Sequence, residues 1–158
     1  MNLNNPDLSF RPEIAQDKAF LERLYHSTRG DLLKLGLPDA MLVNLMQMQF
    51  NAQQNAYLMH YPDGEYLVVE KKGEPIGHLV THHGDETIRL VYIAFLPDER
   101  NRGHGRRLIQ TLQSKAAETN KTLALMADTR NEQAKDLYLS LGFRLNSDDG
   151  ASIKMSWP

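Results

Sequence analysis

The stretch that decides the fold of this chain is residues 88–107, which read IRLVYIAFLPDERNRGHGRR. Its first part, Ile88 to Leu96, is almost continuously apolar, as expected of a β-strand covered on both faces. From Leu108 onward apolar residues recur at helical spacing, and Gly103 and Gly105 lie between the strand and that helix. The stretch therefore predicts a strand, a tight turn that contains glycine, and the N-terminus of a helix.

The predicted turn has the properties of an anion-binding loop. Two glycines two positions apart let the backbone turn sharply and direct several N–H groups to one point. The helix that follows adds the partial positive charge of its N-terminus. Four arginines occupy the same eight residues: Arg100, Arg102, Arg106 and Arg107. We therefore expect an anion of high charge, and a phosphorylated cofactor fits better than a carboxylate.

Length and composition indicate an ordinary globular protein. At 158 residues the chain is expected to form one domain, residues 1–158, that buries roughly 70% of the surface of its unfolded form. A formal charge of −2 argues against nucleic acid and anionic lipid as partners. The chain has no cysteine, which excludes disulfides and thiolate chemistry and fits a reducing compartment. No apolar run of about 18 residues occurs, so we expect a cytoplasmic protein without a membrane span.

Strand and helix patterns alternate along the chain. The first half predicts a short strand, two helices separated by Gly30 and Gly36, and a β-hairpin. The second half predicts a helix after the glycine loop, a strand covered on both faces, a helix ended by Gly142, and two final strands. The expected segments are 8–11, 18–28, 38–58, 66–70, 76–82, 88–96, 106–119, 123–127, 132–141, 144–146 and 153–157. This order predicts an α/β fold, with helices packed on a mixed sheet.

Two sets of residues resemble the GNAT superfamily of acyl-CoA-dependent N-acetyltransferases. The first is Arg100-x-x-Gly103-x-Gly105, preceded by a strand that ends in Leu96-Pro97. The second is Asn131, followed by Leu137-Tyr138 and then by Leu141-Gly142-Phe143. The resemblance extends from about Tyr66 to the C-terminus. It implies a mainly antiparallel sheet of about seven strands with about four helices, in which a splayed strand pair holds acetyl-CoA, and it requires no metal.

The resemblance also implies roles for individual residues. The backbone of Ala94 and Phe95 corresponds to the strand that binds the pantetheine arm, and Asn131 and Tyr138 correspond to residues that contact the cofactor near its sulfur. The residues that would bind the diphosphate are Arg100, Arg102, Gly103, His104, Gly105 and Arg106. Tyr138 is the predicted general acid, or a hydrogen-bond donor to the sulfur. From periodicity alone Tyr138 would be a core aromatic, and Asn131 would be a helix N-cap.

The general base is harder to assign. Many relatives carry a Glu in or beside the strand that here spans residues 89–96, and this strand contains no acid. Residues in and around the hairpin offer alternatives that act through water: Glu70, His78, His82, His83, Asp85, Glu86 and Tyr92. Among these we predict Glu70 or His82.

The expected activity is transfer of acetyl from acetyl-CoA to a primary amine by direct attack in a ternary complex. Residues 18–58 and the hairpin are expected to surround the acceptor amine, whose identity stays open, as does the acyl chain length. The alternative is a non-catalytic acyl-CoA-binding sensor or interaction module. A dinucleotide-dependent oxidoreductase is disfavoured, because Leu108 replaces the third glycine of that fingerprint. Trp157 suits either a sheet edge or a homodimer contact, and both stay open.

Overall fold

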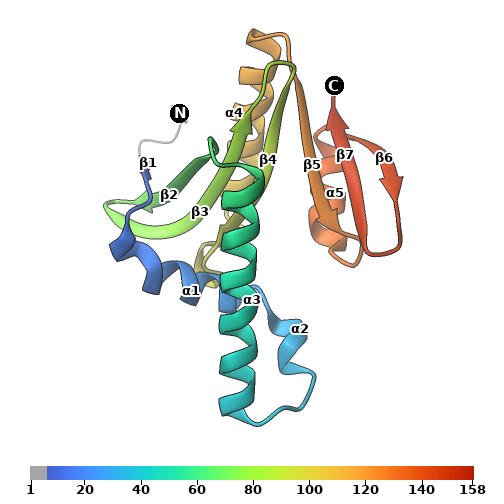
Figure 1. Cartoon of the computed structure of the whole chain (residues 1–158). Helices are drawn as coiled ribbons and strands as arrows, with labels where there is room; N and C mark the ends of the chain where they lie inside the picture. The colour runs from blue at the N-terminus through green and yellow to red at the C-terminus, as the bar shows by residue number, and fades with distance from the viewer. Residues whose placement is uncertain (1–6) are drawn as a thin grey trace.

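The computed structural model describes residues 7–158, which form seven strands and five α-helices. Figure 1 shows how these elements are arranged. In chain order the elements are β1 (Leu8–Pro12), α1 (Lys18–Ser27), α2 (Gly30–Leu33), α3 (Asp39–His60), β2 (Glu65–Lys71), β3 (Glu74–His83), β4 (Thr87–Phe95), α4 (His104–Glu118), β5 (Thr122–Asp128), α5 (Glu132–Ser140), β6 (Arg144–Asp148) and β7 (Ser152–Trp157). Short 3₁₀ turns precede α1 and follow β4. Within this range, no helix has the length and apolar character needed to cross a bilayer.

The strands form a single sheet with the order β1-β2-β3-β4-β5-β7-β6. Neighbouring strands in the sheet are antiparallel, except for β4 and β5, which are parallel and are connected by α4. The predicted mixed, mainly antiparallel sheet of seven strands is therefore confirmed.

The parallel pair is short, and this decides where a ligand can enter the sheet. Pairing runs only from Thr87↔Thr122 to Leu90↔Leu125, and β4 continues to Phe95 beyond it. Figure 1 shows β4 and β5 close together at one end and diverging toward the other. The register of β3 also shifts here, because Thr81 pairs with Leu90 and Val80 pairs with Tyr92. Val91 is thus an extra residue in β4, and such a bulge changes which side chains point to each face.

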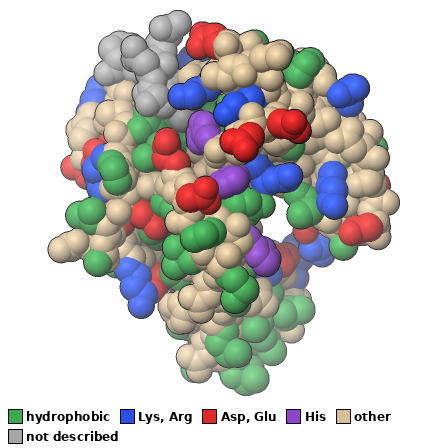
Figure 2. All heavy atoms as spheres, turned by 45° about the horizontal axis from the view of Figure 1, so that its top comes forward, with side chains coloured by type: hydrophobic (Ala, Val, Ile, Leu, Met, Phe, Trp, Pro, Cys, Tyr) green, Lys and Arg blue, Asp and Glu red, His purple; other side chains and the backbone are tan. Residues whose placement is uncertain are grey.

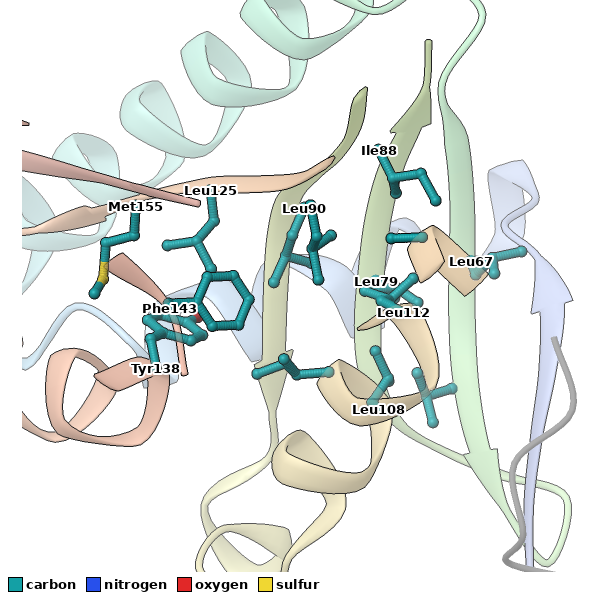
Figure 3. Close-up of a cluster of buried hydrophobic side chains, with 14 of the residues drawn as sticks. Leu67, Leu79, Ile88, Leu90, Leu108, Leu112, Leu125, Tyr138, Phe143 and Met155 are labelled. Carbon is teal, nitrogen blue, oxygen red and sulfur yellow. The ribbon is translucent and has the colours of Figure 1, made fainter. Parts of the chain in front are cut away.

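The helices α4 and α5 cover one face of the sheet and form the main core. Figure 3 shows leucine side chains of α4 directed at the strands, and Tyr138 and Phe143 grouped with Leu125 and Met155. The apolar stripe of α4 predicted from its spacing is buried as expected: Leu108, Ile109, Leu112 and Ala116. This packing holds the N-terminal end of α4 at the open end of the β4–β5 gap.

The helices α1 and α3 cover the opposite face, but only over part of the sheet. Phe20, Leu24 and Phe50 pack there with Val68 of β2, and Ala94 of β4 borders the same cluster. The strand β4 is therefore covered on both faces, as predicted. The same prediction for residues 123–127 is wrong, since Met126 of β5 is 55% exposed. Neither α1 nor α3 extends over that part of the sheet (Figure 1).

One helix was not expected from the sequence. α2 is a single turn that begins at Gly30, a residue predicted to break helical structure. A glycine at a helix terminus is much less costly than one in its interior, and burial of Leu32 holds this short turn in place. Gly36, with φ of +68°, ends the segment before α3 as predicted. Residues 7–158 thus form five α-helices, where about four were expected.

Candidate active site

A cavity of about 640 Å³ lies at the open end of the β4–β5 gap. It is bordered by the end of β4, the loop and N-terminus of α4, and one side of α5. Its lining residues are Thr28, Ile93, Ala94, Phe95, Glu99, Arg100, Asn101, Gly103, His104, Gly105, Arg106, Ile109, Asn131, Gln133, Ala134, Leu137 and Tyr138. Most of the residues predicted to contact the cofactor therefore line one cavity.

The backbone at the start of α4 forms the anion-binding end of this cavity. Gly103 adopts φ of +83°, a conformation that favours glycine, and the helix begins at the next residue. In the first turn of an α-helix the N–H groups have no acceptor within the helix. A Cβ added at Gly105 would meet no atom within 4 Å, so the cavity extends to the backbone at this point. The first turn of α4 can therefore approach a phosphate closely.

The arginines of the loop take different positions. Arg100 donates from Nε to the carbonyl oxygen of Phe95 at 2.9 Å and from a terminal nitrogen to Ser27 Oγ at 3.0 Å. Arg106 donates to Ser140 Oγ at 3.1 Å and so links α4 to α5. Arg102 is exposed and is not among the residues that line the cavity. Arg100 and Arg106 thus brace the cavity walls while adding positive charge to it.

The side chain of His104 contacts a carboxylate inside the cavity wall. Its Nε2 atom lies 3.0 Å from Glu99, and its ring lies 5.5 Å from that of Phe95. Lys71 of β2 approaches the same carboxylate at 3.3 Å. The contacts with His104 and Lys71 lower the pKa of Glu99 below its ordinary value. The His104 side chain therefore stabilises the loop. The part of His104 that can bind phosphate is its backbone N–H group.

The edge of β4 beside the gap is available to an extended ligand. On one side Ala94 and Phe95 pair with His78 and Gly77 of β3. On the other side pairing with β5 has ended at Leu90, and within residues 7–158 no other strand takes its place. Ala94 and Phe95 both line the cavity. Peptide-like amide groups can bind such an edge as an added strand would.

The helix α5 supplies the wall opposite the loop. Asn131 caps this helix, since its Oδ1 accepts from the backbone N–H of Ala134 at 3.2 Å, and it also borders the cavity. Gln133 donates to Asn101 at 2.8 Å and thereby links α5 to the loop. The capping role is confirmed, and it does not prevent contact with a cofactor.

Tyr138 is both a core residue and a cavity residue. Its side chain is 7% exposed, and its ring packs 5.6 Å from that of Phe143. Burial raises the pKa of the Tyr138 phenol to about 12. The phenol is therefore neutral at physiological pH, and it can donate a hydrogen bond into the cavity.

The two predicted bases lie elsewhere. Glu70 of β2 is 3.3 Å from Arg11 Nε, and His82 of β3 is 3.1 Å from Asp63 Oδ1. Neither residue lines the cavity that contains Tyr138. His82 lies near the paired end of β4, beside Tyr61, in a separate depression.

Sequence reasoning missed several cavity residues, including Thr28, Glu99 and Gln133. Thr28 is the C-cap of α1, some 65 positions before the β4 residues that line the same cavity, and no motif marks it. Within residues 7–158, no group of three or more His, Cys, Asp or Glu side chains is arranged to hold a metal.

The comparisons with known proteins agree with this geometry. A model of the acetyltransferase (GNAT) family matches residues 32–143, and no curated protein is significantly similar in sequence. The PaiA N-acetyltransferase of Thermoplasma acidophilum, solved in complex with coenzyme A, has a TM-score of 0.70 at 12% identity, over 94% of this chain and 97% of that chain. An acetyltransferase from Thermus thermophilus has a TM-score of 0.67 at 23% identity, over 96% of each chain. A GNAT acetyltransferase from Elizabethkingia anophelis with acetyl-CoA bound has a TM-score of 0.59 at 20% identity, over 96% of this chain and 98% of that chain.

This chain shares its fold with solved acetyltransferases. The family model spans most of the chain. The protein belongs to the acetyltransferase (GNAT) family and is an acyltransferase.

Proposed function

We propose that this protein transfers an acetyl group from acetyl-CoA to a primary amine by direct attack in a ternary complex. The observation that carries the proposal is the cavity itself. It combines the first turn of α4, the edge of β4 and the phenol of Tyr138 in one continuous space. The solved relatives that contain coenzyme A or acetyl-CoA support this choice of co-substrate.

The cofactor would lie along the gap in an extended form. Its diphosphate binds the backbone N–H groups of residues 103–106, with Arg100, Arg102 and Arg106 supplying positive charge. Its pantetheine amides pair with the backbone of Ala94 and Phe95. Asn131 contacts the cofactor from α5. This orientation brings the thioester between β4 and Tyr138.

In the reaction the amine nitrogen attacks the thioester carbonyl carbon, the C–N bond forms, and the C–S bond then breaks. The amine loses one proton to a base, and the sulfur leaves as a thiolate that is later protonated. An ordinary thiol has a pKa near 8.5, well below the value of about 12 for Tyr138. Tyr138 therefore acts mainly by donating a hydrogen bond to the departing sulfur, rather than by complete proton transfer.

His82 is the better of the two predicted bases. The carboxylate of Glu70 is paired with Arg11, whereas His82 lies in the strand next to β4 and near its paired end. Since His82 does not line the cavity, it would receive the proton through water. Replacement of His82 by Ala should then change the pH–rate profile, and an unchanged profile would exclude His82.

Calorimetry followed by a thiol-release assay tests the proposal. We expect the purified chain to bind coenzyme A and acetyl-CoA, and to release free thiol only when a primary amine is added. Binding without amine-dependent release would instead support the alternative, a non-catalytic acyl-CoA-binding module. Failure to bind either form of the cofactor would contradict both.

A further inference from the structure

A polar stripe on α3 contacts the α1–α2 turn and β4. Gln49, Gln53 and Tyr57 lie at i, i+4 and i+8, so they share one face of the helix. Gln49 accepts a hydrogen bond from Arg29 at the start of α2. The ring of Tyr57 lies 6.2 Å from that of Tyr92 in β4. The stripe therefore extends from the α1–α2 turn to β4.

This stripe continues to the cofactor cavity through two residues. Thr28 lines the cavity. It also lies close to Tyr92, because it lowers the pKa of that phenol and so opposes part of the increase caused by burial. The bulge at Val91 lets Tyr92 and Ala94 face the α1 and α3 side, while Ile93 remains in contact with the main core. We call Gln53, Tyr57, Tyr92 and Thr28 the acceptor wall.

Two polar atoms in the acceptor wall are buried without a partner. Within residues 7–158, neither Gln53 Oε1 nor Tyr92 Oη has a partner with hydrogen-bond geometry. The Thr28 hydroxyl lies near the Tyr92 phenol, but it donates to the carbonyl oxygen of Tyr25 at 2.7 Å. Buried polar groups in proteins almost always have partners, and an unsatisfied one costs about 1–3 kcal/mol. Both oxygens can accept from an N–H group. Burial also raises the pKa of Tyr92 to about 12, which keeps the phenol uncharged.

Three carboxylates on the elements around the acceptor wall are already paired. Glu13 lies 2.7 Å from His78, whose ring contacts that of Tyr92. At the two sides of the gap Asp31 is bound by Arg29 and Asp128 is bound by Arg130, both at 3.0 Å. Figure 2 shows a hollow beside the central column of the molecule, with acidic and basic side chains interspersed around it. A substrate with several positive charges would find its counterions already engaged.

The geometry points to an acceptor that carries a single amino group on an uncharged apolar or aromatic body. Its –NH₂ group donates to Gln53 Oε1 and Tyr92 Oη, and its body packs on the rings of Tyr57 and Tyr92. A second ammonium group would have to leave water without a carboxylate to receive it, which is strongly unfavourable. This inference deepens the proposed acetyl transfer and depends on it.

A pair of matched amines tests the charge preference. Hexylamine and 1,6-diaminohexane have the same length and differ in one terminal ammonium group. We expect kcat/KM to be at least about tenfold higher for hexylamine, which corresponds to about 1.4 kcal/mol. Equal values, or a preference for the diamine, would overturn the inference.

The variant Gln53→Glu tests the residue itself, because it keeps the shape and adds an unpaired carboxylate. We expect the ratio of kcat/KM for the diamine to that for hexylamine to rise about tenfold, while KM for acetyl-CoA stays the same. Gln110→Glu, at an exposed position of α4, is the matched control and should leave the ratio unchanged. A ratio that does not move in Gln53→Glu would remove Gln53 from the acceptor site. Should that variant fail to fold, Gln53→Leu is used, and it must lower kcat/KM for hexylamine with KM for acetyl-CoA unchanged.

The two proposals fail in different ways. Bound acetyl-CoA without turnover of any amine contradicts the proposed function, and with it the acceptor assignment. Efficient turnover with a preference for the diamine contradicts the acceptor assignment alone.

Discussion

The cofactor side and the acceptor side of this molecule are built in different ways. Apart from Thr28, the cofactor side comes from one continuous segment, from β4 through α5. The acceptor side that we propose is assembled from side chains of α1, α3, β3 and β4, which are far apart in sequence. Only the first of these produces a spacing that can be recognised in the sequence.

The difference follows from what each side must bind. A diphosphate is recognised by N–H groups that any sequence can supply, provided that glycines allow the loop to form. An amine of unknown shape is recognised by particular side chains at particular positions, and many arrangements would serve. A cofactor site is therefore easier to predict than an acceptor site on the same fold.

The largest effect should come from a charge placed in the cofactor side. Gly105→Glu directs a carboxylate into the cavity at the start of α4, where a Cβ meets no atom within 4 Å. We expect the Kd for acetyl-CoA in calorimetry to rise by about 100-fold or more, or about 2.7 kcal/mol, with an unchanged melting temperature. Gly30→Glu is the matched control, since its Cβ also meets open space. Similar affinities for the two variants would mean that the first turn of α4 does not bind the diphosphate.

Removal of the Tyr138 hydroxyl tests the role of this residue in catalysis. Tyr138→Phe should lower kcat by about 10- to 100-fold, the range expected for a lost hydrogen bond to a charged group, with little change in the Kd for acetyl-CoA. Because the pKa of Tyr138 is about 12, the phenol stays protonated below about pH 11. The variant should thus be slower by the same factor at every pH from 6 to 10. Tyr66→Phe serves as the control, since Tyr66 does not line the cavity. Unchanged turnover in Tyr138→Phe would exclude the residue from the mechanism.

A smaller effect is expected where β3 supports the cofactor edge of β4. A Cβ added at Gly77 would lie 2.7 Å from the Phe95 ring and 2.8 Å from the carbonyl oxygen of Ala94. Gly77→Ala should lower the free energy of unfolding by about 1–3 kcal/mol in urea denaturation, and it should weaken acetyl-CoA binding as Phe95 moves. Gly30→Ala has open space and should not destabilise the protein. Full stability in Gly77→Ala would show that β3 and β4 can separate at little cost.

On the acceptor side, an ion pair anchors α1 to β1. Asp17 is buried and accepts two hydrogen bonds from Arg11 at 2.8 Å, which hold its pKa below the ordinary value. This stabilisation is present above about pH 4 and is lost as the pH falls through the lowered pKa. Asp17→Asn should cost about 1–2 kcal/mol of unfolding free energy at pH 7, and this cost should decrease progressively as the pH is lowered below about 4. Asp136→Asn, at an exposed position, is the control, and a pH-independent loss in Asp17→Asn would contradict the assignment.

The prediction of helices and strands was most accurate where burial gives the apolar residues a regular spacing. The helix stripe of α4 and the apolar run of β4 both pack as their spacing indicates. The prediction for β5 was wrong on one face, because a short apolar strand looks the same whether or not a helix covers it. No sequence pattern predicts the bulge at Val91, yet this bulge determines that Tyr92 faces the α1 and α3 side of the sheet.

The amino-acid order by itself determined the segment that forms the cofactor cavity, since a strand, a glycine turn and a helix N-terminus are local structures with local causes. Tertiary structure alone decided which distant side chains meet there. Thr28 reaches the cavity, the amide oxygen of Gln53 is buried, and Glu70 and His82 do not line the cavity. These positions depend on how the helices pack across the sheet, and packing is a property of the whole folded chain.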